Sequence, residues 1–145
     1  MTRIKLCGLS RPEDIASANR VQPEFVGFVF VPGSKRYVST RQTQRLKALL
    51  SPGSRQWACL PVRNRRQWLD SGAGMGTAFD WVLLLRHIKR PYFLAGGLGP
   101  GKVERAVELL HPYAVDVSLG IETEGVKDLS KMAAFVAAVR KEDKR

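Results

Sequence analysis

The chain has 145 residues, of which 44% are hydrophobic, and a formal net charge of +11. This length fits one domain spanning residues 1–145, and the apolar fraction indicates a packed core rather than a disordered tail. No apolar run approaches the roughly 20 residues that a membrane helix needs, and the charged start lacks the apolar region of a signal peptide. Composition therefore predicts a cytoplasmic protein without a membrane partner.

The positive charge is concentrated in one part of the sequence. Between Glu24 and Asp70 there is no acidic residue, whereas nine basic residues occur: Lys35, Arg36, Arg41, Arg45, Lys47, Arg55, Arg63, Arg65 and Arg66. Such a stretch fits nucleic acid, a small phosphorylated and carboxylated substrate, or a solvated face without a ligand. Composition alone favours the solvated face.

The first predicted unit is a strand that ends at Cys7, followed by a helix over residues 12–21. Because successive side chains of a strand alternate, Lys5 and Cys7 are expected on the same face. Ser10 with Glu13 three residues later predicts a capping box at the helix start. The unit is a β-to-α junction with a thiol at its edge.

Cys7 is the first candidate for chemistry, although a small buried apolar residue is the commoner role of a free cysteine. A thiol, with an ordinary pKa of about 8.5, acts as a base or nucleophile at neutral pH only when a cation or a helix N-terminus lowers that value. Lys5 and the start of the following helix supply both. The second cysteine, Cys59, stands at an unrelated position, and the pair has neither the number nor the spacing of a disulfide framework or a zinc site.

Strand and helix patterns alternate through most of the remaining chain. Strands are predicted over residues 25–30, 56–60, 92–98 and 114–120, and helices after Ser39, over 81–87, from Pro100 and after Asp128. The apolar helix faces are predicted to hold Leu46, Leu49 and Leu50, then Val103, Ala106, Val107 and Leu110, then Met132, Phe135, Val136 and Val139. Residues 54–69 form an irregular segment, since 61–68 have neither a strand nor a helix period. Repeated strand–helix units favour a parallel sheet, either closed as a barrel or open.

Asp116 is the second candidate, because it stands in the middle of an apolar strand. A buried aspartate is costly unless it is paired or functional, and desolvation raises the pKa of a carboxyl group. A raised pKa suits a general acid. A structural partner for a nearby lysine or arginine is an equally good interpretation.

Glycines follow several predicted strands. They are Gly72, Gly74 and Gly76, then Gly96 and Gly97, then Gly120. Bare backbone amides near helix N-termini bind phosphate without side chains, and barrels often bind phosphate at the loops after their last two strands. The last two glycine sets therefore predict a phosphate site.

Five motifs stand in order along the chain: Lys5-Leu6-Cys7-Gly8-Leu9, Gly27-Phe28-Val29-Phe30 through Ser34-Lys35-Arg36-Tyr37-Val38, Gly76-Thr77-Ala78-Phe79-Asp80-Trp81, Leu94-Ala95-Gly96-Gly97-Leu98 and Val115-Asp116-Val117-Ser118-Leu119-Gly120-Ile121-Glu122. With Val126-Lys127-Asp128, they resemble phosphoribosylanthranilate isomerase of tryptophan biosynthesis over about residues 3–50 and 71–140. The resemblance implies a (β/α)8 barrel. It also implies an Amadori rearrangement of N-(5-phosphoribosyl)anthranilate to 1-(2-carboxyphenylamino)-1-deoxyribulose 5-phosphate.

The same resemblance implies a role for each candidate residue. Cys7 would be the general base at the sugar C2, Asp116 the general acid at the ring oxygen, and Arg36 the partner of the anthranilate carboxylate. The phosphate would lie among Gly96, Gly97, Ser118 and Gly120. No metal or organic cofactor is implied. Because an arginine suits the carboxylate of a small phosphorylated substrate, one basic residue is explained without nucleic acid, which is therefore disfavoured as a partner.

The chain departs from this pattern in its middle. A full barrel takes roughly 200 residues or more, whereas this chain has room for about five to six βα units. The shortage falls at the irregular segment 54–69, where the middle strands and the family's Gln-Leu-His-Gly motif would stand, so an internal deletion is indicated. Leu119 also stands where the family usually has a second serine before the glycine.

Three outcomes follow from such a deletion. The chain could form a smaller barrel or open sheet, close by pairing with a second chain, or be an internally deleted product that keeps the motifs without the activity. The irregular composition of 54–69 mildly favours the last. The alternative to an isomerase is therefore a non-catalytic remnant, or a binding protein whose basic stretch holds anions such as nucleic acid.

Overall fold

The structure is a computed structural model that describes residues 1–53, 55–59, 68–70 and 91–144. Six strands form one parallel sheet in the order β3-β2-β1-β6-β5-β4. Their bounds are β1 (Arg3–Cys7), β2 (Phe25–Val29), β3 (Arg55–Cys59), β4 (Trp68–Asp70), β5 (Phe93–Ala95) and β6 (Ala114–Val117). Within the described residues, β3 and β4 are the two ends of this sheet. The predicted parallel α/β architecture is confirmed in this shortened form.

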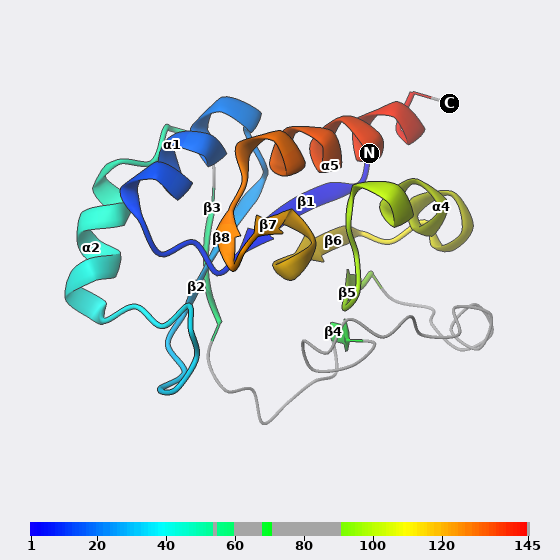
Figure 1. Cartoon of the computed structure of the whole chain (residues 1–145). Helices are drawn as coiled ribbons and strands as arrows, with labels where there is room; N and C mark the ends of the chain where they lie inside the picture. The colour runs from blue at the N-terminus through cyan, green and yellow to red at the C-terminus, as the bar shows by residue number, and fades with distance from the viewer. Residues whose placement is uncertain (54, 60–67, 71–90, 145) are drawn as a thin grey trace.

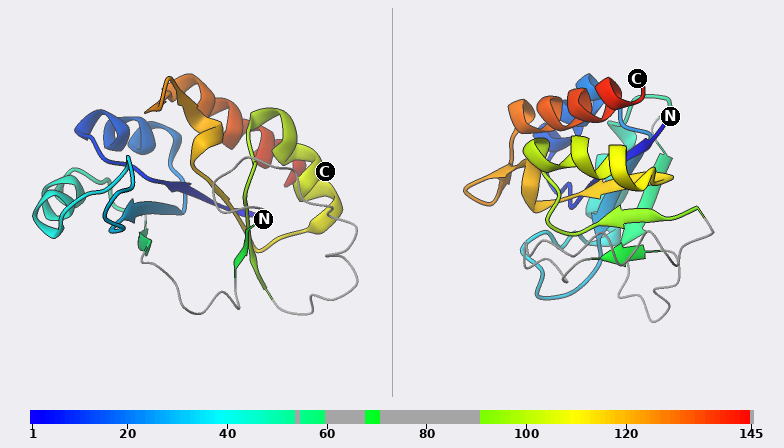
Figure 2. Two further views of the ribbon diagram at one scale, coloured as in Figure 1. Left: turned by 60° about the horizontal axis from the view of Figure 1, so that its bottom comes forward. Right: turned by 90° about the vertical axis from the view of Figure 1, so that its right-hand side faces the viewer.

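Helices α1 (Pro12–Val21), α2 (Thr40–Ala48), α4 (Pro100–Leu110) and α5 (Leu129–Glu142) lie on one side of the sheet (Figures 1 and 2). Helix α5 packs against both α4 and α1. The core between helices and strands is built from the helix positions that periodicity predicts, including Val103, Ala106, Met132 and Phe135. Strands β1, β2, β5 and β6 bury nearly every side chain, in agreement with the continuous apolar runs of the sequence.

The centre of the sheet is strand β1, between β2 and β6. In the register of these pairs, Cys7 is the partner of Gly27 on β2, and Lys5 is the partner of Asp116 on β6. The first and last strands of the parallel sheet in chain order, β1 and β6, are therefore neighbours. Residues 111 positions apart in sequence meet because of this pairing.

The N-terminal caps of two helices match the sequence prediction, and that of α1 differs. The Ser39 hydroxyl accepts a hydrogen bond from the Gln42 backbone N–H, and Asp128 caps α5 by accepting from Ser130 and Lys131. At α1 the predicted Ser10–Glu13 box is wrong.

The residue before α1 that acts as N-cap is Arg11, and the Asp14 carboxylate accepts the backbone N–H of both Ser10 and Arg11 at 2.9 and 3.0 Å. Asp14 lies three residues after this N-cap, the spacing at which a side chain reaches back to the N-cap amide, whereas Glu13 is one residue short.

Further differences concern single elements. Strand β4 begins at Trp68, at the end of the stretch for which no strand was predicted. The strand predicted over 114–120 ends at Val117, and a short 3-10 turn, η1 (Leu119–Ile121), follows it. A two-stranded antiparallel hairpin, β7 (Glu122–Thr123) and β8 (Val126–Lys127), was not predicted. Leu49 is 52% exposed rather than buried, because α2 already ends at Ala48. The predicted helix over 81–87 and the glycines at 72, 74 and 76 lie outside the described residues.

Candidate active site

The predicted site residues gather at the carboxyl edge of the sheet. Strand β1 ends at Cys7, β5 ends just before Gly96, and β6 ends just before Ser118. Because parallel strands end at one edge, residues from distant parts of the chain meet there, and this is the edge at which α/β barrels carry their active sites. Arg36 joins them from the loop after β2.

Cys7 is almost fully buried, with 8% of its surface exposed, and its sulfur is not part of a disulfide. Its neighbour across the β1–β2 pair is Gly27. A Cβ at position 27 would lie 2.9 Å from Cys7 Sγ and 3.1 Å from Lys5 Cε, so a larger residue would displace both side chains. Lys5 and Cys7 therefore share one face of β1, as strand alternation predicts.

Lys5 and Asp116 form a buried ion pair between β1 and β6. The distance from Lys5 Nζ to Asp116 Oδ2 is 3.1 Å, and the two side chains are 0% and 8% exposed. A neighbouring ammonium favours the ionised carboxylate. This arrangement matches the structural interpretation of Asp116, a partner for a lysine, more directly than it matches a protonated acid.

Arg36 is held by Glu122, the first residue of β7. The Nε of Arg36 donates to Glu122 Oε1 at 2.6 Å, and Nη2 donates to Oε2 at 2.7 Å. These hydrogen bonds raise the pKa of Arg36 above its ordinary value, and the charge of a Cys7 thiolate adds to the effect. The guanidinium therefore lies within electrostatic reach of the thiol.

Lys127 completes this cluster from β8. Its Nζ donates to Glu122 Oε1 at 2.6 Å and to the Ser118 carbonyl and hydroxyl oxygens at 2.9 and 3.2 Å. Burial lowers the pKa of Lys127, although Glu122 opposes that effect. Burial by itself raises the pKa of Glu122, but the hydrogen bonds from Arg36 and Lys127 hold it below its ordinary value. The hairpin is thus tied to the end of β6.

Gly8 makes room for the aliphatic part of Arg36. Its φ of +76° is in the left-handed region, and a Cβ there would lie 2.4 Å from Arg36 Cδ and 3.1 Å from Ser118 Oγ. The turn after Cys7 therefore serves two purposes: it starts α1, and it provides the surface on which the Arg36 side chain lies.

The predicted phosphate loops are in direct contact. Gly96 and Gly97 have φ values of +91° and +61°, and a Cβ on Gly120 would lie 1.9 Å from the Leu98 carbonyl oxygen. Helix α4 begins just beyond, with Gly99 as an N-cap that gives no side-chain hydrogen bond. Backbone amides at such a helix start are available to an anion. The geometry therefore suits a phosphate between these two loops.

Sequence reasoning did not assign roles to Glu122 and Lys127, although both stand in motifs that carry the resemblance. The signal available in the sequence was a pair of opposite charges on either side of the turn Glu124-Gly125. It also passed over Asp70, which is the last residue of β4, pairs in register with Ala95, and so lies at the same edge. An acidic residue at a strand end directly before a glycine-rich stretch was the available signal.

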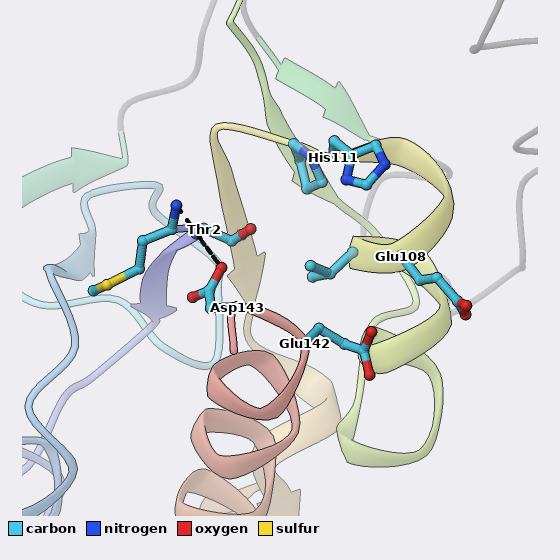
Figure 3. A pocket seen from close by; sticks show the side chains of 8 residues that line it. Thr2, Glu108, His111, Glu142 and Asp143 are labelled. Atoms are coloured by element: carbon cyan, nitrogen blue, oxygen red, sulfur yellow. Dashed lines mark hydrogen bonds and ion pairs between the residues drawn. The ribbon is translucent and has the colours of Figure 1, made fainter. Parts of the chain in front are cut away.

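Away from this edge the structure has a pocket of about 390 Å³ at the opposite end of the molecule (Figure 3). Its lining includes Thr2, His111 and Asp143, and Asp143 accepts the backbone N–H of Thr2 there. The described residues contain no cluster of three or more side chains able to hold a metal ion. None of the described helices combines the length and the apolar character that a bilayer crossing requires.

Comparison with curated proteins finds relatives along nearly the whole chain. An N-(5'-phosphoribosyl)anthranilate isomerase of Caldanaerobacter subterraneus is 30% identical over 201 aligned positions, covering 97% of this chain and 98% of the relative. One from Clostridium kluyveri is 32% identical over 198 positions, with the same coverage. Both alignments are longer than the 145 residues here, so they contain a substantial gap in this chain.

Solved structures agree with these relatives. TrpF from Jonesia denitrificans matches at 26% identity with a TM-score of 0.82, covering 99% of this chain and 98% of that one. The phosphoribosyl anthranilate isomerase of Thermotoga maritima, at 24% identity and a TM-score of 0.84 over 97% and 100% of the two chains, shares the fold.

The model of the family described as N-(5'phosphoribosyl)anthranilate (PRA) isomerase matches residues 61–138, more than half of the chain. The family match, the identity to the Caldanaerobacter and Clostridium proteins and the shared fold agree with one another. On this evidence the chain belongs to the phosphoribosylanthranilate isomerase family.

Proposed function

We propose that this chain catalyses the Amadori rearrangement of N-(5-phosphoribosyl)anthranilate to 1-(2-carboxyphenylamino)-1-deoxyribulose 5-phosphate in tryptophan biosynthesis. The observation that carries the proposal is the meeting of Cys7, Arg36 and the Gly96–Gly97 and Gly120 loops at the carboxyl edge of one parallel sheet. A thiol, a guanidinium and an anion-binding backbone match the three parts of this substrate, namely the sugar, the carboxylate and the phosphate.

The residues have distinct roles in this proposal. The phosphate binds among Gly96, Gly97, Ser118 and Gly120, and Arg36 binds the anthranilate carboxylate. Protonation of the ring oxygen breaks its bond to C1 and leaves an iminium at the anthranilate nitrogen. The Cys7 thiolate then removes the proton at C2, the electron pair moves toward the nitrogen, and the resulting enolamine becomes the aminoketose. The positive charges of Arg36 and Lys127 support a thiolate at this position.

The proton donor to the ring oxygen is proposed, from the resemblance, to be Asp116. Its neighbours on β1 are Lys5 in register and Cys7 two residues further on. The ion pair with Lys5 favours the ionised form, so Asp116 must take up a proton before it can donate one. The role of Asp116 therefore needs a test that is independent of the one for Cys7.

Complementation of a tryptophan auxotroph that lacks the isomerase tests the function directly. The wild-type chain is expected to restore growth, and the purified protein is expected to turn over the substrate. Cys7→Ala should lower kcat by at least about 100-fold, because general-base catalysis contributes a factor of that order or more. Arg105→Met, at an exposed position beyond the first turn of α4, is the control and should keep wild-type activity.

A folded wild-type chain that neither complements nor turns over substrate would contradict the proposal. It would favour the alternative of a non-catalytic remnant, which two observations support: the described sheet ends at β3 and β4, and the alignments to relatives are gapped in this chain. A dimeric enzyme of the family from Thermotoga maritima is known, at 26% identity to this chain. Closure of the sheet by a second copy is therefore an outcome that sedimentation of the active protein would reveal.

A further inference from the structure

The geometry points to Glu122 as the residue that positions Arg36 for carboxylate binding, an inference that rests on the proposed function. A guanidinium has two edges with parallel N–H groups: Nε with one terminal nitrogen, and the two terminal nitrogens together. Glu122 takes the first edge, at 2.6 Å from Nε and 2.7 Å from Nη2. Nη1 makes no hydrogen bond to any residue that the structure describes, so the second edge remains for a ligand.

Glu122 is itself fixed, which is what a positioning residue requires. Its side chain is 5% exposed and Lys127, 3% exposed, donates to its Oε1 at 2.6 Å. Lys127 in turn holds both oxygens of Ser118 at the end of β6. The orientation of the Arg36 guanidinium is therefore set by the same strand end that forms part of the proposed phosphate site.

The charge balance of the cluster also favours binding of an anion. Two cations, Arg36 and Lys127, share the single carboxylate of Glu122, and a positive potential remains at the edge of Arg36 that faces away from Glu122, where it acts on both the proposed Cys7 thiolate and a bound ligand. A substrate carboxylate would complete the pairing. Because side-chain disorder lowers affinity, a guanidinium held in advance binds with a smaller loss of conformational entropy than a mobile one.

The test is binding of two probes by calorimetry. One is reduced 1-(o-carboxyphenylamino)-1-deoxyribulose 5-phosphate, and the other is the same molecule without the carboxylate. Glu122→Gln removes the charge and one of the two hydrogen bonds accepted from Arg36, so affinity for the carboxylate probe should fall about tenfold or more. Affinity for the second probe should be unchanged. In turnover, KM should rise by more than kcat falls.

Two further variants make the result specific. Glu124→Gln removes the same charge from an exposed position two residues away and should change neither affinity. In an Arg36→Met background, Glu122→Gln should cause no further loss for the carboxylate probe, because the inference has Glu122 act on the substrate carboxylate only through Arg36. Glu122→Asp, which keeps the charge but shortens the side chain, should show the same carboxylate-specific loss and decides the matter if Glu122→Gln does not fold.

An equal loss for both probes, no loss, or tighter binding of the carboxylate probe by Glu122→Gln would overturn the inference. Tighter binding would mean that Glu122 competes with the substrate instead of orienting its partner. Failure of the proposed function is distinguishable, since the wild-type chain would then bind neither probe and turn over no substrate, whatever stands at position 122.

Discussion

At the scale of single residues, the ion pair of Lys5 with Asp116 has two interpretations: Asp116 is a catalytic acid, or it is a structural partner of Lys5. Both depend on the burial of the pair. Two charged side chains that are 0% and 8% exposed interact strongly, but removal of one leaves the other as a buried charge without this ion-pair partner, which destabilises the fold. Loss of activity in a single variant would therefore not identify a catalytic acid, since the fold around Cys7 would change as well. Stability and turnover have to be measured together.

A double-mutant comparison separates these meanings. Asp116→Asn should lower kcat by more than about 100-fold if Asp116 is the acid, and should lower the free energy of unfolding by about 3–5 kcal/mol because Lys5 loses the described carboxylate. Lys5→Met with Asp116→Asn should regain stability without regaining turnover. If the double variant instead turns over substrate as Lys5→Met alone does, Asp116 is only a structural partner, and Asp70 at the same edge is the next acid to substitute. Urea denaturation and steady-state kinetics measure both quantities.

Residue roles were harder to predict than residue positions, and Arg36 shows the reason. The sequence places an arginine after the second strand, and the resemblance supplies a carboxylate for it, but the partner that orients it is Glu122, 86 residues later. That contact depends on a hairpin whose strands have two residues each, too short for a periodic pattern. Local sequence therefore predicts which side chains reach the edge, whereas their mutual contacts depend on the tertiary fold.

Among the elements, the glycine loops after β5 and β6 act as one unit. A side chain at Gly120 would meet the backbone oxygen of Leu98, which cannot move without shifting the start of α4. The close approach of the two loops, rather than their individual turns, requires glycine there. Sequence reasoning predicted that both loops hold phosphate but could not predict this contact, because it joins the chain at positions 98 and 120.

Gly120→Ala should therefore separate the two loops and weaken phosphate binding. We expect a loss of more than tenfold in affinity for the reduced product analogue, together with a lower melting temperature, measured by calorimetry and thermal denaturation. Gly101→Ala is the matched control, since a Cβ there has nothing within 4 Å and lies inside α4. It should keep affinity and gain up to about 1 kcal/mol of stability from helix propensity. Unchanged affinity in Gly120→Ala would show that these loops do not bind the phosphate.

The sequence predicted the larger elements well wherever a period or a cap was present. Helices α2 and α5 begin where Ser39 and Asp128 predict, and the buried positions of α4 follow its apolar spacing. The first turn of α1 was misread because the side chain that reaches back is Asp14 rather than Glu13. Strand β3 lies where a strand is predicted over 56–60, whereas β4 was not predicted, because it begins at Trp68 at the end of the stretch without a period.

At the scale of the whole molecule, the two edges of the sheet have different roles: the carboxyl edge holds the candidate site, and the amino edge holds structural contacts. Cys7, Arg36 and the glycine loops stand at the carboxyl edge, whereas the amino edge holds the contacts that join the two ends of the chain. Arg140 near the end of α5 donates to the Thr2 carbonyl, to Glu24 and to Asp143. Asp143 accepts the Thr2 N–H, and Glu24 accepts that of Ile4 on β1. The termini accordingly lie together (Figure 1).

Substitution at this second edge should change stability without changing chemistry. Arg140→Ala removes contacts between α5, the N-terminus and the residue before β2, so the free energy of unfolding should fall by about 1–3 kcal/mol, as for hydrogen bonds to charged groups. Values of kcat and KM, measured well below the melting temperature, should stay within about twofold of wild type. The reason is that residues at the amino edge of such sheets contribute to stability, whereas catalytic residues lie at the carboxyl edge. Arg105→Ala, exposed on α4, is the control and should change neither quantity. A folded Arg140→Ala protein with kcat/KM lowered more than tenfold would mean that the two edges are coupled through β1. The activity of Cys7 would then depend on the Arg140 contacts at the opposite end of its strand.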